Sequence, residues 1–181
     1  ALSPCENSGP LHMNIPRFLQ LYKEDRLEEA FESVIMDNPL PASTGRVCQH
    51  PCEHRCRRAG MDQAVNMREV HRFIADAIYA SGKYDELIEK VLERRLPPTG
   101  RKVAVVGAGP TGLTCAYYLA LEGHQVKIID MLSEPGGTVA VGIPDYRMPR
   151  QLLQREADIV AALGVEIEYG VKLGRDVTLA Q

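Results

Sequence analysis

The sequence predicts two domains of different fold class, an all-helical domain over residues 1–96 and an α/β domain over residues 97–181. Apolar residues recur at helical spacing in the first part, whereas short apolar runs typical of buried parallel strands follow in the second. A Pro-Pro-Thr-Gly segment at residues 97–100 separates the two patterns. A glycine-rich loop at residues 107–112 then lies between a strand and a helix, which indicates the first part of a Rossmann-like fold.

Four helices are predicted in the first domain from the spacing of their apolar residues. They cover residues 15–22, 27–35, 67–80 and 84–94. Between the second and third helices, a loop rich in proline, glycine, cysteine and arginine runs from Pro39 to about Ala64. A helical domain of this size with so few aromatic side chains has a thin core, and a bound metal would therefore help it to fold.

The second domain is predicted to alternate strands with helices. Strands are expected at residues 102–106, 125–130 and 165–169, and helices at residues 111–122 and 152–163. The first strand is a short apolar run bounded by Gly107, as expected of a buried parallel strand. Helical connections between successive strands are typical of a parallel sheet.

The overall composition excludes several classes of protein. The 181 residues include 21 lysines and arginines against 24 aspartates and glutamates, which gives a formal charge of −3, and 45% of the residues are hydrophobic. This is the composition of a soluble globular protein, without a broad basic surface for nucleic acid. No apolar run approaches the roughly 20 residues that cross a bilayer, and no signal peptide is recognisable, so we expect no membrane span and a cytoplasmic location.

The glycine loop has the spacing Gly107-Ala-Gly109-Pro-Thr-Gly112. The first glycine permits a tight turn, the second lets the backbone approach a diphosphate, and the third lets the helix pack closely on the strand. The diphosphate then lies at the helix N-terminus, where unpaired N–H groups stabilise its charge. Asp130 ends the second strand 18 residues after Gly112, where its carboxylate would bind a ribose. This register favours a dinucleotide site over a purely structural glycine turn.

Two features bear on which dinucleotide is bound. An acid at position 130 disfavours a 2′-phosphate and therefore NADP in this site. The segment Glu134-Pro-Gly136-Gly137 adds a second glycine pair shortly after that acid. This arrangement is closer to the FAD site of flavoproteins with two dinucleotide domains than to the NAD site of a dehydrogenase. The sequence therefore predicts FAD, with NAD as the alternative.

Five cysteines are present, and three of them, Cys48, Cys52 and Cys56, have C-x3-C-x3-C spacing. An odd number without a secretory signal argues against a disulfide framework and for metal binding. The spacing leaves two alternatives open, a zinc site completed by a neighbouring histidine and an iron–sulfur cluster with Cys5 as fourth ligand. Three unligated thiols are the third alternative. Cys115, in the helix after the glycine loop, is expected to be a small core residue.

Taken together, these motifs resemble a known family. The segments that carry the resemblance are Asn38-Pro-Leu-Pro, residues 45–58 around the three cysteines, residues 103–113 at the glycine loop, Gly136-Gly137, residues 142–149 (Gly-Ile-Pro-Asp-Tyr-Arg-Met-Pro) and residues 174–179 (Gly-Arg-Asp-Val-Thr-Leu). They are spread over almost the whole chain. The chain resembles the small (beta) subunit of NADPH-dependent glutamate synthase and its relatives, including the N-terminal iron–sulfur and FAD domains of dihydropyrimidine dehydrogenase-like flavoproteins.

The resemblance implies that the helical domain carries a [4Fe-4S] cluster. It implies Cys48, Cys52 and Cys56 as cluster ligands, with Cys5 matching one of the N-terminal cysteines of the family. His71 occupies a helix position at which some relatives place a cluster ligand other than cysteine.

For the second domain, the resemblance implies an FAD site of which this chain holds the N-terminal part. The glycine loop would hold the diphosphate and Asp130 the ribose, while the second glycine pair would lie along the FAD. Arg147 would lie near the flavin and Leu173 at its edge. The implied residues are Gly107, Ala108, Gly109, Pro110, Thr111, Gly112, Asp130, Gly136, Gly137, Thr138, Arg147 and Leu173.

Two departures from the family pattern bear on the cluster. The family's N-terminal motif ends in Cys-Pro, whereas Gly9-Pro10 stands here, and the cysteine pairs that relatives carry further upstream are missing. Five cysteines cannot supply two fully thiolate-ligated clusters. We therefore expect one cluster held by the four cysteines named above, or a cluster completed by His71 or by another chain.

The function implied by the resemblance is that of an iron–sulfur flavoprotein electron-transfer subunit, an oxidoreductase component that is active with partner chains. Electrons would pass between NAD(P)H-reduced FAD and the clusters of a partner. Because the chain ends at Gln181, we expect a fragment or split subunit, with another chain completing the FAD domain and the NAD(P)H site. The alternatives are a cofactor-holding assembly subunit without turnover and an NAD-binding fragment with a structural zinc knuckle.

Overall fold

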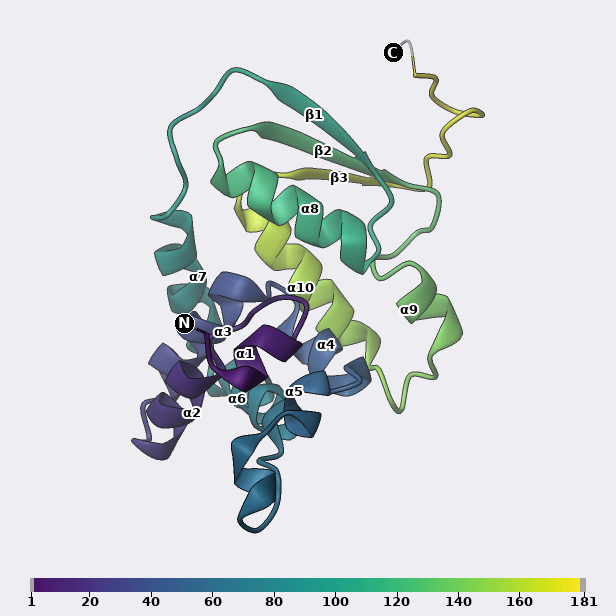
Figure 1. The fold of residues 1–181 in the computed structure, drawn as a ribbon. Coiled ribbons are helices and arrows are strands. Elements are labelled where there is room, and N and C mark those ends of the chain that lie inside the picture. Colours follow the sequence, from purple (N-terminus) through teal and green to yellow (C-terminus); the bar gives the residue numbers. More distant parts are fainter. Residues whose placement is uncertain (1, 180–181) are drawn as a thin grey trace. The chain divides into compact units, whose positions relative to one another are not determined.

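The computed structural model describes residues 2–179 and forms two compact units, Ala1–Leu87 and Ile88–Gln181. The division falls within helix α7 (Tyr84–Leu92), ahead of the proline-rich segment at residues 97–100. The first unit is helical, and the second contains the sheet (Figure 1). None of the helices in the described part of the chain is both long and apolar enough to cross a membrane.

The helical fold class predicted for the first part of the chain is confirmed. Its helices are α1 (Pro4–Ser8), α2 (Ile15–Lys23), α3 (Leu27–Asp37), α4 (Pro41–Val47), α5 (Pro51–His54) and α6 (Met67–Ser81), with a 3-10 turn at Arg57–Gly60. The four predicted helices correspond to α2, α3, α6 and α7, and their ends differ from the prediction by at most two residues.

The prediction of a loop over residues 39–64 is wrong in part. α4, α5 and the 3-10 turn all form within it, and α1 forms ahead of the first predicted helix. The prolines that suggested a loop, Pro41 and Pro51, each begin a helix. Proline is well tolerated at that position, because the first N–H of a helix has no intrahelical partner. Pro4 begins α1 in the same way.

The core of the first unit forms where α2, α3 and α4 pack against α6. Phe18 of α2, Phe31 of α3 and Ile74 of α6 are each at most 1% exposed. Phe31 meets Tyr79 of α6 edge to face, with 6.1 Å between the ring centroids. α6 is therefore the element on which the other helices assemble.

α4 approaches α6 more closely than most side chains would allow, because its contact residue is Gly45. A Cβ at Gly45 would lie 2.7 Å from Cβ of Arg72 and 3.1 Å from Nε2 of His71. Such distances are too short for a methyl group without movement of one helix. The close contact thus sets the position of Cys48, which directly follows α4.

The second unit is built on a parallel three-stranded sheet with the order β1–β2–β3. The strands are β1 (Lys102–Val106), β2 (Gln125–Asp130) and β3 (Glu166–Tyr169), and the helices that follow β1 and β2 are α8 (Pro110–Leu121), α9 (Thr138–Gly142) and α10 (Arg150–Ala162). α8 and α10 contact each other on one side of the sheet (Figure 1). The predicted α/β class is confirmed, and α9 is the one described helix of this unit that the apolar spacing missed.

β1 is less buried than the sequence predicts, because it lies at one edge of the sheet. Side chains alternate between the two faces of a strand, and Val105 is 9% exposed whereas Val106 is 60% exposed. Cys115 is also exposed, which corrects the prediction that it belongs to the core. The buried residues of α8, including Leu113 and Ala116, lie on the opposite side of the helix from Cys115.

The turn from β1 into α8 depends on glycine at two positions. Gly107 has φ of 105°, a left-handed conformation that favours glycine. A Cβ at Gly112 would lie 1.8 Å from the carbonyl oxygen of Gly107. α8 can therefore start this close to β1 only because residue 112 has no side chain, which is the role that the motif predicts for the third glycine.

We expect Gly112→Ala to destabilise the second unit by about 3 kcal/mol, because the new methyl group overlaps a backbone carbonyl within a tight turn. Gly60→Ala is the matched control, since a Cβ there meets no atom within 4 Å. The control should change the free energy of unfolding by less than about 0.5 kcal/mol. Urea unfolding followed by circular dichroism measures both, and equal stabilities would contradict the steric argument.

Candidate cofactor sites

Gly107, the first glycine of the loop, lines a hollow of about 450 Å³ in the second unit. Gly109 is the N-cap of α8, so the N–H groups of the first turn have no partner within the helix. Pro110 takes the first helical position, and Thr111 beside it is exposed. Five of the residues implied for FAD line the hollow, namely Gly107, Asp130, Gly137, Thr138 and Leu173.

The second glycine pair lies directly against the first loop. The N–H of Gly136 donates to the carbonyl of Ala108 at 2.9 Å. A Cβ at Gly137 would lie 3.0 Å from Cα of Gly109, and Gly137 itself has φ of 52°. The two glycine segments therefore form one continuous backbone surface, with no side chain between them.

Asp130 fixes the glycine loop to the end of β2. The residue is 7% exposed, and its Oδ2 atom accepts the N–H of Ala108 at 2.5 Å. Its Oδ1 atom accepts the N–H of Leu132 at 2.7 Å. The ribose contact stays a prediction, and the carboxylate has in addition a structural role that the spacing did not reveal.

Leu173 and Arg147, the two implied residues furthest along the chain, are placed differently. Leu173 lines the same hollow as the glycine loop, whereas Arg147 is exposed in the turn after α9 and is not among the residues lining that hollow. Arg150 holds this turn, because its guanidinium donates to the carbonyls of Ile143 at 3.0 Å and Met148 at 3.2 Å. Motif reasoning missed Arg150, since nothing in the sequence distinguishes it from a surface arginine at a helix start.

The first unit contains a second cavity, of about 200 Å³, with an almost entirely apolar wall. Cys48, which follows α4, and Cys52 of α5 line it together with His71 of α6. Gly9 and Pro10, after α1, belong to the same wall. Thiolate sulfur and imidazole nitrogen are donors that suit iron–sulfur clusters and zinc.

His71 is the most buried of the candidate ligands. It is 6% exposed, and its Nε2 atom is buried without a hydrogen-bond partner. Burial lowers the pKa of the imidazole to about 4, so the ring is neutral at neutral pH, which is the form that ligates metals. A buried unpartnered nitrogen costs about 1–3 kcal/mol, and a bond to a metal would remove that cost.

Burial, together with the charges of Cys48 and Glu53, raises the pKa of the Cys52 thiol to about 11. The metal-free chain therefore carries a protonated Cys52. A bound cation reverses this effect, because a coordinating thiol is deprotonated outright. These residues fit a metal cofactor with nitrogen and sulfur ligands.

Only some of the predicted ligands line this cavity. Cys5 and Cys56 are not among the described residues that line the cavity of Cys48, Cys52 and His71. Cys5 belongs to α1, which contacts α5, and all the cysteines are free of disulfides. Within residues 2–179, no three His, Cys, Asp or Glu side chains converge closely enough to hold a single metal ion.

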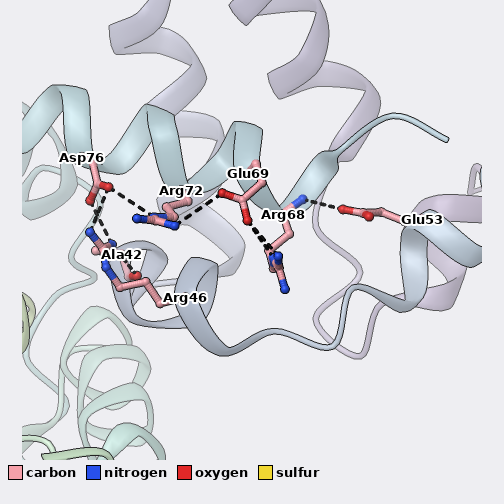
Figure 2. A network of polar contacts seen from close by, with 7 residues as sticks. All are labelled: Ala42, Arg46, Glu53, Arg68, Glu69, Arg72 and Asp76. Atoms are coloured by element: carbon pink, nitrogen blue, oxygen red, sulfur yellow. Dashed lines mark hydrogen bonds and ion pairs between the residues drawn. The ribbon is translucent and has the colours of Figure 1, made fainter. Parts of the chain in front are cut away.

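A network of polar contacts anchors α4 and α5 to α6 (Figure 2). Arg46 of α4 is 10% exposed and donates two hydrogen bonds of 2.9 Å to the carboxylate of Asp76. Glu53 of α5 accepts the N–H of Arg68, in the first turn of α6, at 3.0 Å. Arg72 of α6 forms ion pairs with both Glu69 and Asp76, and thereby connects the two ends of the network. Sequence reasoning missed this network, because its partners are 30 and 15 positions apart.

Both units match known families. Residues 1–83 match the family described as dihydropyrimidine dehydrogenase domain II, 4Fe-4S cluster, and residues 105–160 match the NAD(P)-binding Rossmann-like domain. The resemblance inferred from the sequence is confirmed. The match of the helical unit to a 4Fe-4S family favours an iron–sulfur cluster over zinc.

Relatives with named functions are oxidoreductases or their subunits. The chain is 44% identical over 182 residues to the NADPH-Fe(3+) oxidoreductase subunit beta of Geobacter sulfurreducens and 37% identical over 194 residues to the NADP(+)-dependent formate dehydrogenase subunit beta of Moorella thermoacetica. It is 34% identical over 177 residues to the glutamate synthase [NADPH] small chain of Escherichia coli. These matches cover 99%, 99% and 97% of this chain but 26%, 27% and 36% of the relatives. The chain thus spans about a quarter to a third of their length.

We expect Asp76→Ala to destabilise the first unit by about 2 kcal/mol, because the largely buried guanidinium of Arg46 loses both hydrogen bonds to a carboxylate. Asp62→Ala is the matched control, since the pair of Asp62 with Arg58 is exposed to solvent and should contribute little. Thermal unfolding of the metal-free chain compares the two variants. Equal effects would mean that the Arg46 pair does not anchor α4.

Proposed function

We propose that this chain is the iron–sulfur flavoprotein part of a multi-subunit oxidoreductase, which passes electrons between NAD(P)H-reduced FAD and the iron–sulfur clusters of a partner. The observation that carries the proposal is that one chain combines two candidate cofactor sites. One is a cavity lined by two thiols and a neutral imidazole, and the other is a cradle of two glycine segments. Flavin and cluster supply the redox chemistry when bound, and the protein supplies binding, orientation and electrostatics.

For the cluster, we propose Cys48, Cys52 and His71 as ligands. In support, these donors share an apolar cavity but do not converge on one point, as the four ligands of a tetrahedral zinc ion must. A cluster accepts its ligands on separate iron atoms, which lie further apart. Cys5 and Cys56 lie outside the lining of this cavity, and we propose them as ligands only together with donors of another chain.

For the dinucleotide, we propose FAD, held by the twelve residues that the resemblance implies. The continuous backbone surface of Gly109 and Gly137 supports close approach of a diphosphate. Asp130, at the end of β2, disfavours a 2′-phosphate in this site. We place Arg147 near the flavin as a further proposal, in line with its exposed position after α9.

For partners, we propose other subunits of an oxidoreductase, including a chain or segment that completes the FAD domain and supplies the NAD(P)H site. Two relatives are named as beta subunits and one as a small chain, and NADPH or NADP(+) occurs in all three names. The chain spans a quarter to a third of these relatives, which is in line with further segments or chains in the complete assembly.

The cluster proposal is tested by counting iron, sulfide, zinc and FAD against protein in the anaerobically purified chain. We expect iron with matching sulfide, and we expect Cys52→Ala to lose most of both and to destabilise the first unit, because cluster binding and folding are coupled. Cys115→Ala is the matched control, since Cys115 is exposed in the other unit. Zinc without sulfide would contradict the proposal and favour a structural zinc knuckle.

The FAD proposal is tested by Gly109→Ala. The new Cβ meets its nearest atom, Cα of Gly137, at 3.7 Å, an ordinary contact, so the fold should tolerate the change. The methyl group does occupy the surface that a diphosphate approaches, and we expect FAD affinity to fall about tenfold or more. Fluorescence titration with FAD measures it, with Gly60→Ala as control. Unchanged affinity would exclude the glycine loop as the diphosphate site.

A further inference from the structure

The apolar cavity of the first unit offers strong metal donors on only part of its wall. Cys48, Cys52 and His71 come from the end of α4, from α5 and from α6. The segment that closes the cavity on the N-terminal side contributes Gly9, Pro10, Leu11, Met13, Ile15 and Phe18. The sulfur donors elsewhere on the described wall are the thioethers of Met13 and Met67, which are neutral, whereas clusters are held by thiolates and imidazoles.

Position 9 has room for a side chain but carries none. Gly9 has φ of −83° and ψ of 137°, an extended conformation open to other residues. A Cβ at this position would meet only the carbonyl oxygen of Cys5, at 4.0 Å. Neither strain nor crowding requires glycine here, in contrast to Gly45 and Gly112. The consequence of Gly9 is therefore that this part of the cavity wall lacks a donor.

We propose that the cavity holds a [4Fe-4S] cluster through Cys48, Cys52 and His71 alone, and that the iron next to Gly9 has no protein ligand and binds water or hydroxide. This inference rests on the proposed function, because it requires a cluster in this cavity. An iron without a protein ligand is the one that oxidation releases. With ferricyanide as the oxidant, such a cluster would release that iron as Fe(II), pass one electron to ferricyanide, and keep its four sulfides and three protein ligands.

The test compares the full chain with Gly9→Cys and Gly9→Ala, each reconstituted anaerobically with iron and sulfide and then oxidised with ferricyanide. We expect the ratio of bound iron to sulfide to fall from about 1 to about 0.75 in the unsubstituted chain, with the electron paramagnetic resonance signal of a three-iron cluster. Gly9→Cys supplies the missing thiolate and should keep its ratio near the starting value. Gly9→Ala fills the same space without a donor and should behave as the unsubstituted chain does.

Further substitutions distinguish two ligand sets, the set of Cys48, Cys52 and His71 proposed here and the set of four cysteines predicted from the sequence. Cys5→Ser and Cys56→Ser should leave the cluster in place, whereas Cys48→Ser and His71→Ala should lose it or most of its iron. Equal loss in Cys5→Ser and Cys48→Ser would overturn the inference and the three-ligand set, and would leave the proposed electron-transfer function standing. Full retention of iron by the oxidised unsubstituted chain would also overturn it. Iron without sulfide, or no iron, would overturn both the inference and the cluster part of the proposed function.

Discussion

Both candidate sites depend on one steric constraint, the approach of two backbone segments where a side chain does not fit. In the second unit, Gly112 lets α8 begin against the carbonyl of Gly107, and Gly137 lies against Gly109. In the first unit, Gly45 lets α4 pack on α6. Each contact brings a segment that carries candidate site residues against a neighbouring segment. A larger residue would not fit at these glycines, because closely packed backbone segments cannot move apart by an ångström without loss of packing. The absence of a side chain at Gly45, Gly112 and Gly137 therefore allows the packing that positions the candidate site residues in both units.

The long elements could be predicted from the sequence because their pattern repeats. α6 has several turns with apolar residues on one face, and β2 has apolar residues at three of its six positions. Helices of four to seven residues such as α4 and α5 complete at most two turns, so no period can be recognised. The first residues of these helices could not be recognised either. Proline is common both at the first position of a helix and in loops, so the sequence alone does not distinguish the two.

The ligand types could be predicted, but not their grouping. On a continuous helix, Cys52 and Cys56 would lie four residues apart on one face. α5 ends at His54, so Cys56 does not share the cavity that Cys52 lines. Cys48 and His71 meet there only through the packing of α4 on α6, which no local spacing encodes. The glycine loop, in contrast, could be predicted from the sequence. Gly107 and Gly112 contact each other within one short segment, and the spacing of the motif encodes that contact.

The donor set of the cavity also bears on the potential of a cluster held there. Each thiolate adds a negative charge, whereas a neutral imidazole and a water add none, so the proposed ligands leave the cluster less negative than four thiolates would. The cost of charge in an apolar cavity rises steeply with its magnitude, and this cavity has an almost entirely apolar wall. Adding an electron to a nearly neutral cluster therefore costs less than adding one to a cluster that is already a dianion. Histidine in place of cysteine raises the potential of two-iron clusters for the same reason. Among clusters of similar burial, this one would accept electrons readily, which suits a place on the receiving side of a flavin.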